Sequence, residues 1–424
     1  MRDIAVLIFL ALCIFAAVKK PWYGVLSLAI FSYLNPHAYA WGSVRFLPVY
    51  MVLFLVVSIR TFNTKDKQPL PNDWRVKTFI CLWLYYFITC SAAYLPDIAW
   101  SRLWTISKIY LPFIFTLLLI NTREKLFYLI VTMAASIGVV SVKGGIFAVL
   151  TGFAGRVYGP PLTQFEENNL FAVTMLMNVP LLLIWRHGTS NMLIKKAIFF
   201  SIPIIYCAAL SSFSRGALLT MTALTLLLLW HSKHKLFAMP MIFVGAVVAS
   251  GFLPQSWYER MNTLQTYDED SSAMGRIVVW IDGWKHTLDH PLTGTGFDGW
   301  IYLTERDWHS SYVEMFSEHG FIAFGLWISL IVGTLMNLSS LAKKTKNIAG
   351  MEWASHTAYM LRASLVCYMV GGAFLGLSYF DFLYHIIFIA VLLKKFILEE
   401  LAVKEGAKPK PRWADAARQV PNGT

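Results

Sequence analysis

Residues 197–230, AIFFSIPIIYCAALSSFSRGALLTMTALTLLLLW, contain two strongly apolar segments on either side of a short polar turn. Each segment has close to the length of about 17–25 residues that an α-helix needs to cross a lipid bilayer. The turn holds a single arginine, Arg215, among serines and one glycine. We therefore predict two membrane-spanning helices, over residues 192–211 and 214–231, joined by a minimal turn.

The same apolar pattern continues along the chain. Of its 424 residues, 57% are hydrophobic and only 14% are charged, whereas about 25% of the residues are charged in a typical soluble domain. The apolar runs are continuous, unlike the short alternating segments of a transmembrane β-barrel. We predict an all-α polytopic membrane protein of about 12 or 13 transmembrane helices. The predicted spans are 3–18, 22–40, 46–60, 76–94, 104–120, 125–150, 168–186, 192–211, 214–231, 236–253, 311–338, 357–378 and 380–397.

These spans divide the chain into four regions. Residues 1–253 are expected to form an N-terminal transmembrane bundle, and residues 311–400 the C-terminal transmembrane helices. Between them we expect a periplasmic loop over residues 254–310, and residues 401–424 are expected to be a disordered, basic cytoplasmic tail. Within the loop, GRIVVWIDGWKHTL has apolar residues at helical spacing, which predicts an amphipathic helix on the bilayer surface or over the bundle. The residues of its apolar face are Ile277, Trp280, Ile281, Trp284 and Leu288.

The basic residues indicate which way the chain crosses the membrane. The formal net charge is +12, but the charges lie in short connectors between apolar runs, so the positive-inside rule explains them better than nucleic-acid binding. The basic connectors are RTFNTKDKQPLPNDWRVK, NTREK, WRHGTSNMLIKK, HSKHK and LAKKTK. We place them in the cytoplasm, and the alternate connectors in the periplasm of a Gram-negative cell, with the chain in the inner membrane.

The residues that usually bind metals or nucleotides do not form recognisable motifs. The five cysteines lie in or beside apolar runs without CxxC spacing, so we expect neither a disulfide nor a thiolate site. HExxH and His/Cys clusters with metal-ligand spacing do not occur. GTGFDG lacks the lysine and the strand-helix context of a phosphate-binding loop. We therefore predict no metal, no nucleotide and no other cofactor.

A few cations oppose the predicted orientation and are therefore candidates for binding an anion. These residues are Arg45, Arg102, Lys108, Arg156, Arg215, Arg260, Arg276, Lys285 and Arg306. Arg215 stands out because Ser214 and Gly216 flank it in the minimal turn and Gly216 permits close approach of another group. The alternative to a functional role is that the Arg215 side chain snorkels to lipid phosphates or caps a backbone carbonyl.

Three further cations are weaker candidates. Arg276 precedes the aromatic part of the amphipathic helix, where an ordinary solvated charge is the alternative. Arg156 lies in the loop GFAGRVYGPP, and Lys143 lies inside an apolar run as a buried ligand or a snorkelling lysine. Because arginine offers a planar fork of donors that suits phosphate oxygens, convergence of Arg156, Arg215 and Arg276 predicts a pyrophosphate site.

Two histidines lie in RDWHSSYVEMFSEHGFIAFGLW, residues 306–327, where polar sequence gives way to an apolar span. His309 lies at the aqueous edge, on the same predicted side as Arg215. Glu314 lies beyond it and either orients the imidazole or caps the first helical turn. His319 lies deeper in the span and is interpreted as a packing residue.

Together, these residues resemble the O-antigen ligase and O-antigen polymerase superfamily, with the best agreement from Val139 to Leu330. The N-terminal stretch is further similar to the O-glycosylation ligase branch associated with exosortase gene clusters. Ser310 occupies a position where many members have asparagine. The motifs are Ser214-Arg215-Gly216, then Gly275, Arg276 and Trp280, then Pro291–Gly296, and finally His309, Tyr312, Glu318 and Gly320.

The resemblance implies a GT-C-like arrangement of the helices and a metal-independent inverting glycosyltransferase at the periplasmic face. The donor would be a glycan linked to undecaprenyl pyrophosphate, and the acceptor a hydroxyl of a lipid A–core sugar. His309 would be the catalytic base, since imidazole takes up a proton near neutral pH. Arg215 and Arg276, helped by Arg156, would bind the pyrophosphate. Ser214, Gly216, Tyr312, Glu314 and Lys143 would support the site.

Other functions remain open at this point. A polysaccharide polymerase and a protein O-oligosaccharyltransferase would use the same donor with different acceptors. A lipid-glycan transporter is less favoured because acidic residues within the spans are scarce, with Asp381 the main candidate, and no internal repeat is evident.

Overall fold

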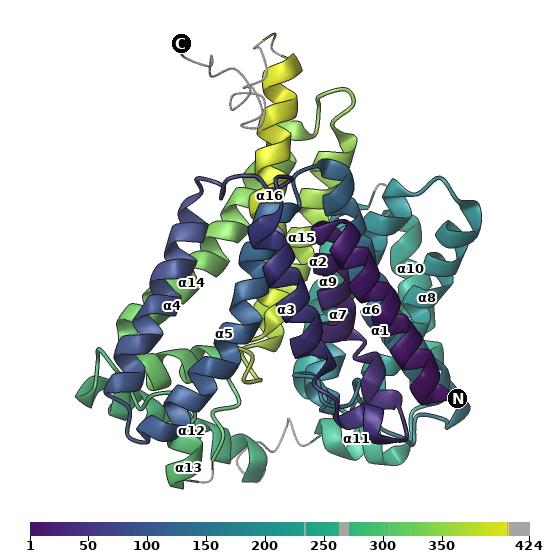
Figure 1. The fold of residues 1–424 in the computed structure, drawn as a ribbon. Helices are drawn as coiled ribbons and strands as arrows, with labels where there is room; N and C mark the ends of the chain where they lie inside the picture. Colours follow the sequence, from purple (N-terminus) through teal and green to yellow (C-terminus); the bar gives the residue numbers. More distant parts are fainter. Residues whose placement is uncertain (233–234, 263–270, 305, 405, 407–424) are drawn as a thin grey trace, which may run out of the picture.

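In the computed structural model, the protein is a bundle of α-helices that run in both directions between two ends (Figure 1). The structure describes residues 1–232, 235–262, 271–304, 306–404 and residue 406, and there is no β-strand within these ranges. Most of the predicted tail, residues 405 and 407–424, lies outside the described residues.

Thirteen of the described helices overlap the predicted spans. They are α1 (Arg2–Lys19), α2 (Pro21–Tyr33), α3 (Val49–Asn63), α4 (Trp74–Ser91), α5 (Pro96–Leu119), α6 (Arg123–Leu150), α7 (Asn168–Gly188), α8 (Met192–Leu210), α9 (Arg215–His231), α10 (Lys235–Ser250), α14 (Ser311–Thr345), α15 (Glu352–Gly371) and α16 (Asp381–Lys404). Judged by length and composition alone, five helices among the described residues are long and apolar enough to cross a membrane, namely α5, α6, α7, α8 and α14. The prediction of an all-α polytopic membrane protein is confirmed.

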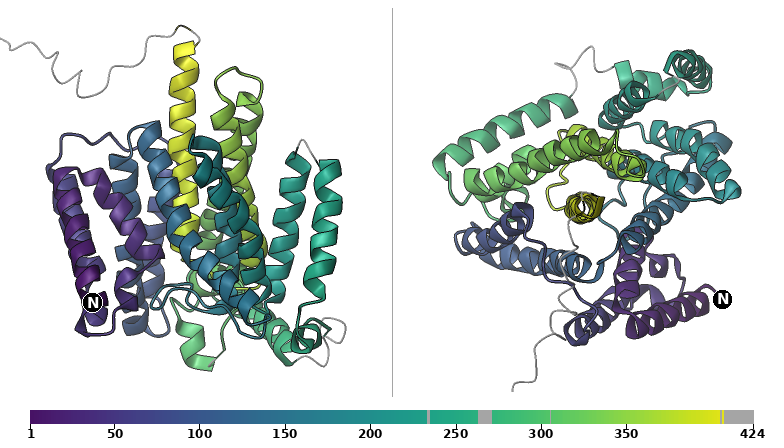
Figure 2. Two further views of the ribbon diagram at one scale, coloured as in Figure 1. Left: turned by 90° about the vertical axis from the view of Figure 1, so that its right-hand side faces the viewer. Right: turned by 90° about the horizontal axis from the view of Figure 1, so that it is seen from above.

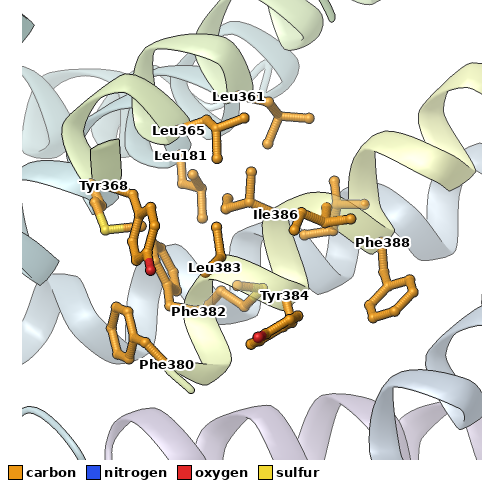
Figure 3. Close-up of a cluster of buried hydrophobic side chains, with 14 of the residues drawn as sticks. Leu181, Leu361, Leu365, Tyr368, Phe380, Phe382, Leu383, Tyr384, Ile386 and Phe388 are labelled. Atoms are coloured by element: carbon orange, nitrogen blue, oxygen red, sulfur yellow. The ribbon is translucent and has the colours of Figure 1, made fainter. Parts of the chain in front are cut away.

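Helix α16 is at the centre of the bundle, as the view from above shows (Figure 2). Every side chain from Asp381 to Leu393 is buried, because the other helices surround α16 on all sides. A helix that is apolar all round is stable only in such a position. In the core, aromatic and aliphatic side chains of α16 pack against Leu181 of α7 and against Leu361, Leu365 and Tyr368 of α15 (Figure 3).

The connectors gather at two opposite ends of the bundle (Figure 1). At the end that we call the basic end, the predicted cytoplasmic connectors meet, and Asp73 forms ion pairs with Arg75 and with Lys394 of α16. The opposite end, which we call the loop end, carries the long connector between α10 and α14. There, Tyr94 donates its backbone N–H to the Thr295 carbonyl at 3.0 Å.

Two predicted spans run seven residues past the end of the helix that occupies them. The predicted span 22–40 ends early, because α2 stops at Tyr33, Asn35 takes a left-handed conformation and 3₁₀ turns begin at Pro36. Proline disfavours helical conformation in the residue before it. The predicted span 357–378 also ends early: α15 stops at Gly371, and residues 372–380 form a loop before α16. Non-helical backbone of this kind is tolerated where protein surrounds it.

The described part of the long connector contains three short or amphipathic helices, α11 (Gln255–Asn262), α12 (Ser271–Asp289) and α13 (Gly299–Thr304). The predicted amphipathic helix is α12, which packs on α14, and its contact face is partly the predicted one, since Trp280 donates to the Trp308 carbonyl and the Trp284 ring packs on Phe316. Val279 and Thr287 are buried, whereas Ile281 is 48% and Leu288 56% exposed. Gly283 explains the difference, since a Cβ there would lie 2.6 Å from the Trp308 ring.

Candidate functional site

The turn before α9 holds Arg215 at a defined position at the loop end. Ser214 caps the helix, because its Oγ accepts a hydrogen bond from the Ala217 N–H at 3.2 Å. The Ser212 carbonyl accepts from the Asn168 side-chain amide at 2.7 Å, and the Ser211 hydroxyl donates to the Gly155 carbonyl. The turn is therefore tied to α7 and to the loop between α6 and α7, which places Arg215 at the first residue of α9.

Two further arginines reach the same turn from distant segments. The Arg156 guanidinium lies 5.9 Å from the centre of the Phe213 ring, and Arg260 of α11 donates from Nε to the Phe213 carbonyl at 3.1 Å. Phe213 has a φ of +58° and lies two residues before Arg215. Three segments thus bring Arg156, Arg215 and Arg260 to one turn, which we call the arginine turn. Of these, Arg260 is among the cations that oppose the predicted orientation, but it was not assigned to the predicted pyrophosphate site.

The other two predicted cations lie on different elements. Arg276 is half-buried on α12, the helix that packs on α14. Lys143 is exposed on α6, with its ammonium 5.5 Å from the centre of the Tyr39 ring. Its exposure excludes the alternative of a buried ligand and leaves the snorkelling lysine.

His309 points outward from the residue pair just before α14. Its side chain is 46% exposed, while the neighbouring Trp308 and Ser310 are buried. The residue has a φ of +47°, and its Nδ1 lies 3.2 Å from Oδ2 of Asp307. Asp307 also accepts the His309 backbone N–H at 3.4 Å. Sequence reasoning missed Asp307, although it is only two residues away.

Glu314 performs neither of the two roles considered for it. Its carboxylate accepts the Ser378 backbone N–H at 3.1 Å and lies against Gly376. Tyr312 donates its hydroxyl to the Met369 carbonyl at 2.9 Å. Both predicted supporting residues therefore hold α15 and the loop that follows it against α14, and Asp307 is the carboxylate that contacts His309.

The loop over residues 372–380 connects the two parts of the site. Glu314 holds it at Ser378, and Ser311 binds it through hydrogen bonds to Leu375 and Leu377 at 2.8 Å each. At its other side, a Cβ on Gly216 would lie 3.2 Å from the Cβ of Phe374. Gly216 thus permits close approach, as predicted, and the approaching group is this loop. The glycines in GGAFLGLS were the available signal for a break in the helix.

The deeper histidine, His319, is structural. It is fully buried, and both ring nitrogens have partners at 2.8 Å, the Thr89 hydroxyl at Nδ1 and the Tyr379 hydroxyl at Nε2. Tyr379 in turn donates to Glu318 at 2.5 Å. With both nitrogens occupied in a buried network, His319 has no access to a substrate.

The glycine motif Pro291–Gly296 has a structural role at the adjacent break in α14. Gly320 has a φ of +75°, which interrupts the helix. The carbonyls of Ser317 and Glu318 instead accept the backbone N–H groups of Thr295 and Gly296 at 2.9 and 2.8 Å. The backbone of the Pro291–Gly296 segment therefore provides hydrogen-bond partners for the carbonyls that the break in α14 leaves without helical ones.

In chemical terms, the loop end offers an arginine turn and an exposed imidazole held by a carboxylate. Across the described ranges, no group of three or more His, Cys, Asp or Glu side chains could hold a metal ion. Guanidinium groups suit phosphate oxygens, and an imidazole can accept a proton. The fold and these residues define the class as an all-α polytopic membrane protein with a cationic site at one end.

Comparison with known families makes this class more specific. Residues 198–328 match the family described as O-antigen ligase, and residues 1–188 match a family of unknown function. The first match includes the arginine turn, α12, His309 and the break at Gly320. It confirms the predicted resemblance to the O-antigen ligase superfamily over these residues. No curated protein gives a significant match.

Proposed function

We propose that the protein transfers a glycan from undecaprenyl pyrophosphate to a hydroxyl of a lipid A–core sugar, as a metal-independent inverting glycosyltransferase. The observation that carries the proposal is the convergence of Arg156, Arg215 and Arg260 on Phe213 from three segments. The match of residues 198–328 to the O-antigen ligase family supports a ligase of this general kind. The basic connectors at the opposite end support a periplasmic position for the site.

On the donor side, the arginine turn binds the pyrophosphate. Charge builds up on the pyrophosphate oxygen as the bond to the anomeric carbon breaks, and fixed guanidinium groups stabilise that charge most where it develops. The leaving group is already a stable anion, so a general acid is not needed. Arg276 belongs to the donor site in this proposal, with α12 as its support.

On the acceptor side, His309 removes the proton from the attacking hydroxyl. When Nδ1 carries a proton and donates to Asp307, Nε2 keeps its lone pair for that proton. Asp307 then stabilises the imidazolium that forms. Attack from the face opposite the pyrophosphate inverts the anomeric centre in a single displacement.

Transfer with purified components tests the proposal. The full chain is incubated with a labelled glycan on undecaprenyl pyrophosphate and with lipid A–core, and labelled lipid A–core is measured. His309→Ala is expected to lower the rate by about 10²–10⁴-fold, the usual contribution of a general base. His290→Ala, which removes an exposed imidazole of the same connector, is the matched control and should retain normal transfer.

The acceptor arms of the same assay separate the alternatives. Transfer only to a growing glycan would make the protein a polymerase, and transfer only to protein Ser or Thr would make it an oligosaccharyltransferase. Movement of the lipid-linked glycan across vesicle membranes without any transfer would identify a transporter and overturn the proposal.

A further inference from the structure

A groove opens at the basic end, far along the bundle from the arginine turn. It lies where the first two turns of α6, the last turn of α7 and the first turns of α15 meet, and its volume is about 280 Å³. Helices α6 and α15 both pack against α7, so the end of α7 forms the floor of the groove. We call it the α6–α7–α15 groove.

An exposed arginine, Arg123, lies at the mouth of the groove. The Arg123 guanidinium lies 3.8 Å from the centre of the Trp353 ring, and the Arg123 side chain is 53% exposed. A Glu400 carboxylate approaches to 3.8 Å, which is long for an ion pair, and arginine has five N–H donors. The guanidinium therefore keeps donors for a further anion. Glu124 also lines the groove, but it is exposed and thus well hydrated.

The interior of the groove is apolar. Phe127, Ile130 and Ile184 line it below the mouth, and Ile130 lies seven residues beyond Arg123, or about 10 Å along α6. Phe127 packs against the glycine that ends α7, since a Cβ on Gly188 would lie 2.4 Å from the Phe127 ring. The groove thus changes from a cation to hydrocarbon over about two helical turns, as a phospholipid does from its phosphate to its acyl chain.

We propose that the α6–α7–α15 groove binds an anionic phospholipid, with the phosphate at Arg123 over Trp353 and one acyl chain along Phe127, Ile130 and Ile184. The apolar walls favour a lipid over free phosphate, because inorganic phosphate would leave them in contact with water. The location fits as well. The positive-inside rule places this end at the cytoplasmic leaflet, where anionic lipids are found and where basic pockets between helices bind their headgroups.

Direct binding to the purified full chain tests this proposal without using transfer activity. In neutral detergent micelles, phosphatidylglycerol and phosphatidylcholine of equal chain length are titrated, and bound lipid is counted by native mass spectrometry. Phosphatidylglycerol is expected to bind more tightly. Arg123→Ala should weaken its binding about tenfold to a hundredfold, the loss expected for hydrogen bonds to a charged group.

Matched variants keep the test decisive. Arg186→Ala removes a cation of the neighbouring connector whose Nε donates to the Lys195 carbonyl, and it should bind phosphatidylglycerol normally. Arg123→Lys, which keeps the charge, should retain most of the preference for phosphatidylglycerol and replaces the alanine variant if that variant does not fold. Ile184→Trp fills the apolar part and should abolish binding of the lipid.

Three results would overturn the proposal. The first is that phosphatidylglycerol and phosphatidylcholine bind equally well, and the second is that both Arg123 variants bind phosphatidylglycerol as the unmodified chain does. The third is that inorganic phosphate raises the unfolding temperature of the chain as much as phosphatidylglycerol does. The last result would show that the groove recognises a free anion.

Discussion

The buried charges at the basic end lead to a quantitative prediction about stability. Arg75 is fully buried and Asp73 is 6% exposed, and they are joined by two hydrogen bonds of 2.8 and 3.0 Å. Lys394 of α16 adds a contact of 2.9 Å to Asp73. Removing one partner of a buried ion pair leaves an uncompensated charge and typically costs about 3–5 kcal/mol. We expect this loss of unfolding free energy for Asp73→Asn, which keeps a side-chain oxygen to cap α4.

An exposed ion pair of the same end is the internal control. Lys125 and Asp66 are 3.2 Å apart, with the Asp66 side chain 68% exposed. Exposed pairs are worth about 0–1 kcal/mol, so Asp66→Asn should change little. Both variants are unfolded by denaturant in the same detergent and followed by circular dichroism. A loss below about 1 kcal/mol for Asp73→Asn would refute the reasoning.

The Asp73 carboxylate also determines the direction in which the free energy of unfolding changes with pH. Burial alone would raise the pKa of Asp73, but hydrogen bonds and charge from Arg75, together with Lys394, hold that pKa well below its usual range. The folded state therefore binds this proton less readily than the unfolded state. The contribution is fully present above the unfolded pKa of about 4 and is lost as the pH falls toward the depressed folded value. Asp73→Asn should reduce the stability difference between pH 7 and pH 3.

Three further predictions concern the loop end. Gly320→Ala should lower stability by about 2 kcal/mol or more, because the residue has a φ of +75° and its Cβ would lie 2.5 Å from the Leu292 backbone; a thermal unfolding scan unchanged from wild type would contradict this. Asp307→Asn should lower kcat for transfer about tenfold or more while KM for the donor stays constant, since it acts through His309; a change in donor KM alone would argue against a positioning role. Arg215→Lys should raise KM for the lipid-linked donor because lysine lacks the bidentate fork, and full activity of this variant would show that a point charge is sufficient.

The helices of the bundle could be predicted because their cause is local. A long run of apolar residues lowers the free energy of a helix in a bilayer wherever it occurs, and the runs are visible in the chain. The ends of α2 and α15 could not be placed in the same way. Leu34 and Asn35, and then Gly372 to Phe380, lie in or beside apolar stretches, and the local signals for a break, Pro36 and the glycines of GGAFLGLS, compete there with an apolar pattern that favours a longer helix.

For the site, too, some features could be predicted from the sequence and others could not. The position of Arg215 in a minimal turn, and of His309 before an apolar span, followed from the order of polar and apolar residues. The role of Glu314 did not, because α14 turns its carboxylate toward Ser378 of a loop 64 residues later. The contact face of α12 was predicted only in part, since Gly283 contributes no hydrophobicity to the pattern but permits close approach to Trp308.

The sequence by itself determined that this chain lies in a membrane, which segments are helical, and which arginine interrupts an apolar hairpin, because each of these depends on residues that are neighbours along the chain. Only the tertiary structure decided that Arg156 and Arg260 join Arg215 at Phe213, that residues 372–380 connect this turn to α14, and that the α6–α7–α15 groove exists. The physical reason is that these features depend on how helices of fixed length pack. That packing brings together segments separated by tens to hundreds of residues and has no counterpart in local apolar patterning.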